Sequence, residues 1–284
     1  MELRQLEYFA AVARHRHFGR AAEAVYVSQP ALSQQVRRLE AELGVALLKR
    51  TSRGVGLTPA GAELLARAET ILAEAGRARA AMDEHAGVVR GSVRVAATPA
   101  DSVRLPETIA AFHRDHPGVR IALRHASAAQ ALELVRSGAV DLAVLSLAGA
   151  DEGLTVTPLA DEPLRLITAS DDPLAGAGPV PLEQLNGRAF VLGEPGSALR
   201  ATVMAACQDQ GFSPVPLLEV GDPATTRHLV GAGLGVALVP ASWLEVPGPE
   251  VGVAAVDPAP RHATSMVTAG ELPPAGRLLA DRLR

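Results

Sequence analysis

Apolar residues near the start of the chain recur at helical spacing. The clearest case runs from Ser28 to Gly44, where an N-cap hydroxyl opens the segment, Pro30 lies in the first turn and a glycine closes it. Its apolar positions follow at i, i+4, i+7 and i+11, so they lie on one side of a helix. They are Leu32, Val36, Leu39 and Leu43. Two shorter helical patterns precede it, over about residues 3–13 and 19–27.

The other side of this helix carries side chains of the types that bind DNA bases. Arginine bonds to guanine, glutamine to adenine, and serine to bases or phosphates. A polar face on an isolated helix is more often simply solvated, but two short helices joined by a tight turn are typical of a helix-turn-helix. We therefore expect the second helix to enter the major groove. The predicted contacts are Arg20, Ser28, Gln29, Pro30, Ser33, Gln34, Arg37 and Arg38.

The segment "LLKRTSRGVGLTPAG" predicts a hairpin and then another helix. It has a strand-like start, a turn at residues 51–54 and a short second strand. Lys49, Arg50 and Arg53 crowd the turn, where cations suit phosphates or the minor groove. Arg50 and Arg53 join the predicted DNA contacts. Residues 1–58 are thus predicted to form a winged helix-turn-helix domain.

A long helix is predicted to follow the hairpin. Thr58 and Pro59 form a start signal, and small or apolar residues recur at alternating spacings of three and four to about Ala86. At 1.5 Å per residue, this helix is roughly 40 Å long. We expect residues 59–88 to be a linker that pairs two chains along Leu65, Ala68, Leu72 and Ala75. The alternative is that this seam packs against its own domain.

From Ser92 onward, strand patterns alternate with helical patterns. "SVRVAAT", "VRIALRHA" and "VDLAVLS" are predicted strands separated by helices, and "AFVLG", "PVPLLEV" and "VALVP" belong to a second set. Such repeats predict an α/β fold whose repeating units are parallel. We expect residues 89–284 to form a two-lobed ligand-binding domain. Lobe I would hold about residues 89–160 and 266–284, and lobe II about residues 161–265.

Ligands of open α/β sheets bind beyond the carboxyl ends of the strands. The predicted effector contacts there are Thr98, Pro99, Asp101, Ser102, Ser127, Ser146, Ser197, Arg200 and Asp222. Hydroxyls and helix N-termini suit a carboxylate or phosphate. Ser127 and Ser197 are equally suited to be plain N-caps, and Arg200 to be in a surface ion pair. The carboxylate of Asp101 would instead repel an anionic ligand, or accept a hydrogen bond from a ligand hydroxyl or amine.

Charge and cysteine content narrow the class of protein. The net charge is -4, which argues against a protein that coats nucleic acid indiscriminately. Residues 1–58 carry +4 and the remainder -8, so a polyanion site is expected at the N-terminal end. Cys207 is the only cysteine, which excludes an intramolecular disulfide and a thiolate zinc cluster and fits a reducing cytoplasm. We expect no signal peptide and no membrane span. The single lysine and many alanines and arginines favour a high-GC bacterium.

The chain resembles the LysR-type transcriptional regulators. The resemblance rests on "LRQLEYFAAVA", "FGRAAEAVYVSQPALSQQVRRLEAELGVALLKR" and "LTPAG", and continues in "HPGVRIAL", "SGAVDLAVLS" and "GAGLGVALVP". It implies a cytoplasmic regulator that binds double-stranded DNA at inverted repeats and responds to a small effector between two lobes. It also implies a homodimer or a tetramer built as a dimer of dimers. Family members often begin the second helix with a hydroxyl residue, whereas this chain has His17 and Gly19 around Phe18. Gln34 stands where a basic residue is common, which should shift base preference.

Two other classes of function were weighed. An enzyme is disfavoured because the histidines are scattered and the carboxylate near His113 and His116 is a single aspartate, so no metal or cofactor is expected. Cys207 lies in the helical pattern "ATVMAACQDQG" and is predicted to be a buried apolar residue rather than a nucleophile. A peroxide-type disulfide sensor would need a second cysteine. A purely architectural DNA-binding protein would have no use for an acidic, two-lobed module.

Overall fold

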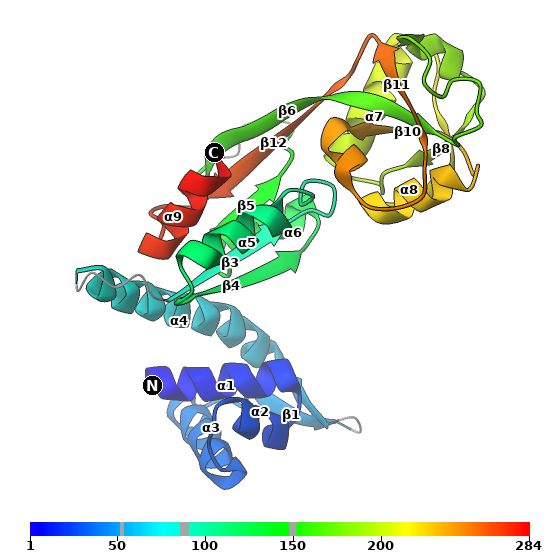
Figure 1. The fold of residues 1–284 in the computed structure, drawn as a ribbon. Helices are drawn as coiled ribbons and strands as arrows, with labels where there is room; N and C mark the ends of the chain where they lie inside the picture. Colours follow the sequence, from blue (N-terminus) through cyan, green and yellow to red (C-terminus); the bar gives the residue numbers. More distant parts are fainter. Residues whose placement is uncertain (52–53, 86–90, 148–151) are drawn as a thin grey trace. The chain divides into compact units, whose positions relative to one another are not determined.

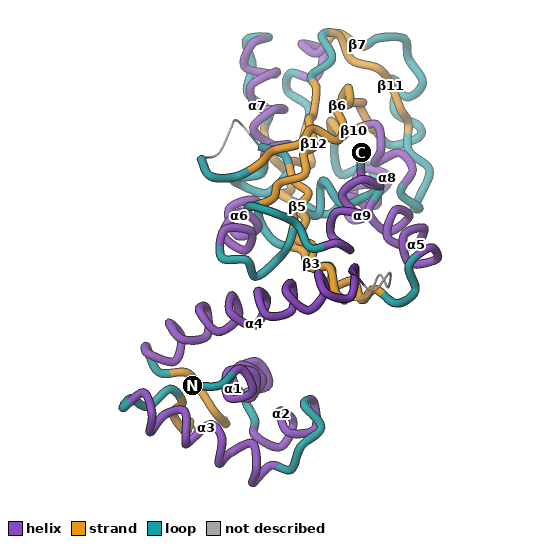
Figure 2. Tube along the Cα trace, turned by 90° about the vertical axis from the view of Figure 1, so that its left-hand side faces the viewer, coloured by secondary structure: helices purple, strands orange, loops and turns teal. Residues whose placement is uncertain are grey.

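The computed structural model describes residues 1–51, 54–85, 91–147 and 152–284. It divides into two compact units, Met1–Val88 with Ser137–Ala139, and Val89–Arg136 with Val140–Arg284. Figure 1 shows the chain coloured from one end to the other, and Figure 2 shows the distribution of helix and strand. None of the helices among the described residues is long and apolar enough to cross a membrane. Each unit is considered separately below.

The N-terminal unit contains three helices, a hairpin and a long fourth helix. These are α1 (Leu3–His15), α2 (Phe18–Ala24), α3 (Gln29–Leu43), β1 (Leu48–Thr51), β2 (Gly54–Leu57) and α4 (Pro59–His85). The predicted stripe of α3 faces the core at Leu32, Val36 and Leu39, which are at most 1% exposed. Leu43 is 39% exposed, so its predicted inward position is wrong: α3 ends at Gly44, and this last turn extends past the core.

Local hydrogen bonds join α3, the hairpin and α4. Glu40 of α3 accepts the backbone N–H groups of Leu47 and Leu48 through Oε1, at 2.8 and 3.1 Å. Thr58 donates its hydroxyl to Ala46 O at 2.7 Å and accepts the N–H of Gly61 at 3.0 Å. A Cβ at Gly61 would lie 2.0 Å from Leu47 O, so only glycine permits this approach. These contacts explain the "TPAG" sequence at the start of α4.

The first half of α4 packs against its own domain. Ala68 is completely buried, and Leu64, Leu65 and Leu72 pack against the core formed by α1, α2 and α3. The prediction that Ala68 pairs with a second chain is therefore wrong, and the alternative of intradomain packing holds for this part of the seam. The core of the small N-terminal domain needs the apolar face of α4 for completion. Further along α4, Ile71 and Met82 are 38% and 63% exposed.

Lobe I of the second unit is built on parallel strands. Strands β3 (Gly91–Ala97), β4 (Val119–His125) and β5 (Leu142–Leu145) are parallel, as predicted, and lie in the order β4-β3-β5. Alternate residues of β3 face opposite sides of the sheet. Val93 and Val95 pack with helices α5 (Leu105–Asp115) and α9 (Pro274–Leu283), and Ala96 packs with α6 (Ala128–Arg136).

Two long antiparallel strands carry the chain between the lobes (Figure 1). β6 (Thr155–Thr168) pairs with β12 (Arg261–Thr268), and β12 also pairs with β5 of lobe I. The pattern had predicted parallel repeating units, and these antiparallel crossings were not foreseen. The far end of β6 pairs with β10 (Ala237–Pro240) and β11 (Gly252–Asp257) of lobe II.

Lobe II has its own apolar core, which includes Phe190, Leu238 and Trp243. The remaining elements are β7 (Val180–Pro181), η1 (Leu182–Leu185), β8 (Ala189–Leu192), α7 (Ala198–Asp209), β9 (Val215–Glu219), α8 (Pro223–Gly231) and η2 (Ala241–Glu245). β8 and β9 form a separate parallel pair. Parallel strands and antiparallel crossings together give a mixed α/β sheet rather than a uniformly parallel one.

Candidate DNA-binding face and effector site

The polar face of α3 is open to solvent. Ser28, Gln29, Pro30, Gln34, Arg37 and Arg38 are exposed, and Ser33 is half-buried. Ser28 is the N-cap, and its hydroxyl accepts the N–H of Ala31 at 3.4 Å. No described side chain forms an ion pair with Arg37 or Arg38. The side chains of Gln34, Arg37 and Arg38 are therefore accessible to DNA.

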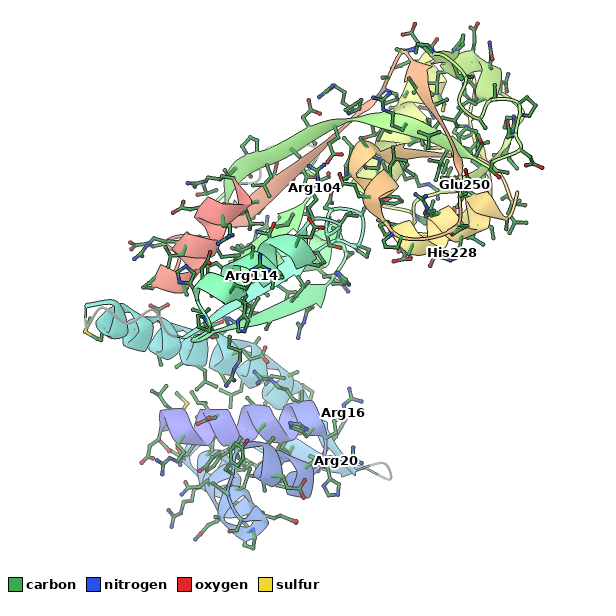
Figure 3. All side chains as sticks on the ribbon, viewed as in Figure 1. Arg16, Arg20, Arg104, Arg114, His228 and Glu250 are labelled. Atoms are coloured by element: carbon green, nitrogen blue, oxygen red, sulfur yellow. The ribbon has the colours of Figure 1, made fainter. Side chains whose placement is uncertain are left out.

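Helix α2 is capped by the side chain of His17. Nδ1 of His17 accepts the N–H groups of Gly19 and Arg20 at 3.1 and 3.4 Å. A Cβ at Gly19 would lie 3.4 Å from Gln29 Oε1, so the first turns of α2 and α3 are close together. Arg20 is exposed at this end of α2 (Figure 3). Arg50 lies in β1 but its side chain is outside the described residues, as is Arg53.

The predicted effector residues do not form one open site. Three of them, Thr98, Asp101 and Ser146, meet in a buried polar network at the carboxyl ends of β3 and β5. Asp101 Oδ2 accepts from the Thr98 hydroxyl at 2.5 Å and from the Ser146 N–H at 2.9 Å. Asp101 Oδ1 accepts from the Thr264 hydroxyl at 3.0 Å. The carboxylate is only 3% exposed.

His262 of β12 completes this network and was missed by the sequence analysis. Its Nε2 lies 2.8 Å from Asp101 Oδ1 and 3.0 Å from Ser146 Oγ, and its side chain is 4% exposed. Burial raises the pKa of Asp101, but hydrogen bonds from His262 and Thr98 and the charge of His262 outweigh it, so the pKa lies below its usual value. Asp101 and His262 are 161 residues apart, and no sequence pattern connects them.

The other predicted effector residues serve mainly as local structure. Ser127 Oγ accepts the N–H of Gln130 at 3.3 Å, and Ser197 Oγ accepts that of Arg200 at 3.2 Å, so both are N-caps. Asp222 caps α8 by accepting the N–H of Thr225 at 2.6 Å, and this bond lowers its pKa. Arg200 pairs with Glu219 at 2.5 Å, which is the surface ion pair weighed above.

The turn after β3 also contacts lobe II. Ser102 donates its hydroxyl to Pro99 O at 3.0 Å, and this bond keeps the turn closed. Trp243 of η2 donates its indole N–H to Ala100 O at 2.9 Å. Arg104, just after the turn, pairs with Glu245 of η2 at 3.2 Å, and within lobe II Ser242 N donates to Glu162 of β6 at 2.7 Å. The turn and η2 thus form direct bonds between the lobes in addition to β6 and β12.

A small cavity in lobe II lies beside Trp243. Its lining is mainly apolar and includes Leu192, Leu199, Leu238 and Thr226. None of the predicted effector residues lines it. Among the described residues, no group of three or more histidine, cysteine or acidic side chains is placed to hold a metal ion.

Comparisons with known proteins cover the whole chain. The family model described as "LysR substrate binding domain" matches residues 86–284, and "Bacterial regulatory helix-turn-helix protein, lysR family" matches residues 3–62. The "Hydrogen peroxide-inducible genes activator" of Pectobacterium carotovorum subsp. carotovorum is 35% identical over 290 residues, which cover 100% of this chain and 96% of that protein.

The chain belongs to the LysR family of bacterial transcriptional regulators.

Solved LysR structures have the same architecture. A full-length OxyR from Pseudomonas aeruginosa, carrying a cysteine-to-aspartate substitution, matches with a TM-score of 0.76 and 29% identity, covering 100% of this chain and 95% of that one. Full-length CbnR in complex with its target DNA matches with a TM-score of 0.75 and 28% identity, covering 100% of this chain and 99% of that one. This LysR protein is thus a DNA-binding transcriptional regulator with an effector-binding domain.

The single cysteine of this LysR protein is fully buried. Cys207 lies on α7 within the apolar core of lobe II, as its sequence pattern predicted. Burial raises the pKa of its thiol to about 11. At pH 7 only about one thiol in ten thousand is then ionised, and the thiolate is the reactive form.

Proposed function

We propose that this chain acts in the cytoplasm as a homo-oligomer that binds an inverted-repeat operator and responds to a small metabolite. The observation that carries the DNA-binding part is the exposed polar face of α3, whose arginines have no described ion-pair partner. A helix of this kind enters the major groove, and phosphate contacts from neighbouring segments fix its orientation. Two copies related by a two-fold axis then require inverted half-sites.

The uncovered part of α4 supports association between chains. Ile71, Ala78 and Met82 are exposed apolar residues at spacings of seven and four, so they lie along one side of the helix. We propose that this stripe, rather than the buried Ala68, pairs with a second copy. Light scattering of the full-length protein tests the proposal. A monomer at micromolar concentration, or an unchanged oligomer in Ile71→Glu, contradicts it.

We propose that the effector is a metabolite with a carboxylate or similar hydrogen-bonding head, bound between the lobes. Ser127 and Ser197 accept bonds from helix N–H groups and retain a hydroxyl hydrogen to donate. The charge of His125, at the end of β4 in lobe I, contributes to the lowered pKa of Asp222 in lobe II. An effector that also carries a hydroxyl or amine would satisfy Asp222.

Trp243 provides a direct test of effector binding. It is the only tryptophan, and its indole bonds to the turn of lobe I, so a change in lobe arrangement should alter its fluorescence. Metabolites are screened by calorimetry against the full chain, and hits are repeated with Ser127→Ala and Ser197→Ala. A physiological effector should bind more weakly to at least one variant, shift Trp243 emission and change the operator footprint. Metabolites whose affinity is the same for the wild-type protein and for both variants would show that the effector site lies elsewhere.

We propose that hydrogen peroxide does not act on this chain through thiol oxidation. One relative is named as a hydrogen peroxide-inducible genes activator, but the sole thiol here is buried and its pKa is raised to about 11. An enzymatic role has even less support. Ser146 and Asp101 both lie beside Nε2 of His262, whereas a catalytic triad places serine and aspartate on opposite ring nitrogens.

A further inference from the structure

Two residues of the N-terminal unit have a backbone conformation that usually requires glycine. Arg16 has φ 52° and Tyr26 has φ 55°, and no other non-glycine residue described in the structure has a positive φ. The left-handed region is unfavourable for residues with a Cβ, and tyrosine is not among the residue types that tolerate it well. Strained residues of this kind are concentrated at functional sites.

The backbone at both positions has a clear structural role. The N–H of Arg16 caps α1 by donating to Val12 O at 2.9 Å, and its carbonyl accepts the N–H of Val55 in β2 at 3.0 Å. The N–H of Tyr26 donates to Glu23 O at 3.2 Å at the end of α2. Glycine would perform these backbone roles without the steric cost. The fold therefore gives no reason for an arginine or a tyrosine side chain here.

The two side chains are open to solvent. Tyr26 is 95% exposed, and Arg16 is exposed at the end of α1 (Figure 3). Neither side chain forms a hydrogen bond or ion pair with another described residue. A ring exposed to this extent contributes almost nothing to the apolar core.

Arg16 and Tyr26 lie on either side of α2, the helix that precedes α3 in the chain. Arg16 lies two residues before α2, beside the turn end of the hairpin at Val55, and Tyr26 lies two residues after α2 and two before the N-cap Ser28. Figure 3 shows Arg16 and the predicted DNA contact Arg20 at the same edge of the N-terminal unit. Guanidinium and phenol hydroxyl groups are among the donors that bind DNA phosphates and fix a protein's register on the duplex.

We propose that Arg16 and Tyr26 contact DNA phosphates on either side of α2 and thereby position α3 in the major groove. This proposal rests on the operator binding proposed above. It explains why both positions keep a functional side chain at the expense of backbone stability. Arg16 contributes a charge, whereas Tyr26 contributes a neutral hydroxyl, so their effects on salt dependence differ.

The test replaces each residue in the full-length protein with glycine. Because glycine relieves the strain, the melting temperature of Arg16→Gly and Tyr26→Gly should stay the same or rise by about 2–4 °C. Operator affinity should nevertheless fall, by about tenfold for Arg16→Gly and about fivefold for Tyr26→Gly. Loss of binding together with retained or increased stability cannot be caused by unfolding.

Salt dependence separates the two contacts. Arg16→Gly should weaken operator and random DNA equally and reduce the slope of log K against log salt by about 0.9, whereas Arg16→Lys should restore the slope. Tyr26→Gly should leave the slope unchanged, and Tyr26→Phe should reproduce most of its loss of affinity. Arg16→Asn is a second variant for the arginine, because asparagine tolerates the left-handed region.

Arg124→Ala, at an exposed site on β4 of the other unit, controls for net charge and should change neither affinity nor slope. The proposal is overturned if both glycine variants bind the operator with wild-type affinity. It is also overturned if Arg124→Ala loses as much operator affinity as the glycine variants, or if both glycine variants melt at a lower temperature than the wild type. Absence of operator binding by the wild-type protein would instead refute the proposed function itself.

Discussion

Glutamine and arginine side chains on α3 are open to solvent, whereas the polar side chains predicted for the effector site are mostly bonded to the protein itself. Arg37 has no described ion-pair partner, but Arg200 is paired with Glu219. Gln34 is exposed on α3, but Ser146 is buried beside Asp101 and His262. Polar side chains thus remain open to solvent in one unit and form internal bonds in the other.

This difference has a physical consequence for how each unit binds its partner. A preformed exposed face can bind DNA without breaking any internal bond. An effector that used Asp101 or Ser146 would have to replace several buried hydrogen bonds, which is costly. We therefore expect DNA contacts to act directly on affinity and the buried network to act on stability.

The largest expected effect follows from removal of the Asp101 carboxylate. Asp101→Ala leaves His262, Thr98 and Thr264 without their shared acceptor and should lower the free energy of unfolding of this domain by about 3 kcal/mol. Urea denaturation monitored by Trp243 fluorescence measures the loss. Asp161→Ala is the matched control, because its ion pair with Arg261 has both side chains 55% exposed, and should cost less than about 0.5 kcal/mol. Equal losses would contradict the contrast between buried and exposed bonds.

Substitutions on the face of α3 should affect DNA binding instead of stability. Arg37→Ala and Gln34→Ala should each weaken the free energy of binding to the preferred operator by about 1–3 kcal/mol, and that of binding to random DNA by less. Fluorescence anisotropy with both DNAs measures the difference. Arg261→Ala, which removes an exposed arginine of β12, should leave operator affinity unchanged. If the loss were the same on both DNAs, these residues would contact phosphates only.

A smaller effect is expected from acid pH. The folded-state pKa of Asp101 is lowered, so its ionised form stabilises the fold above the unfolded-state value of about 3.9, and this contribution is lost as pH falls below it. The free energy of unfolding should therefore decline below about pH 4, by less than the loss in Asp101→Ala. The decline should be reduced in Asp101→Asn. An identical acid profile in that variant would show that other carboxylates dominate.

The smallest effect is expected at Cys207. Peroxide at concentrations that oxidise exposed thiols should leave operator binding unchanged, because the thiol is buried and its pKa is raised to about 11. Native protein should react with a thiol reagent far more slowly than urea-unfolded protein. Operator binding that changes with peroxide in wild type but not in Cys207→Ala would contradict the proposal that peroxide does not act through thiol oxidation.

Local sequence determined much of the DNA-binding unit. The cap at Ser28, the apolar stripe and Gly44 define α3, and the "TPAG" segment predicts the start of α4, because each signal acts over a few residues. The same applies to the alternation of strands and helices in lobe I. His17 shows the limit of such rules, because a ring nitrogen performs the capping role that family patterns assign to a hydroxyl.

Only the tertiary structure decided which polar side chains remain free. The Asp101–His262 bond joins residues 161 positions apart, and the pairing of β12 with β5, which lies beside β3, brings them together. Burial of Ala68 likewise depends on how α4 packs against α1, and neither property is encoded by local spacing. Spacing along the sequence fixes the face of an element on which a residue lies, but the partners of that residue depend on the packing of distant segments. For this reason the sequence by itself identified the polar face of α3, whereas the bonding of the predicted effector residues emerged from the fold.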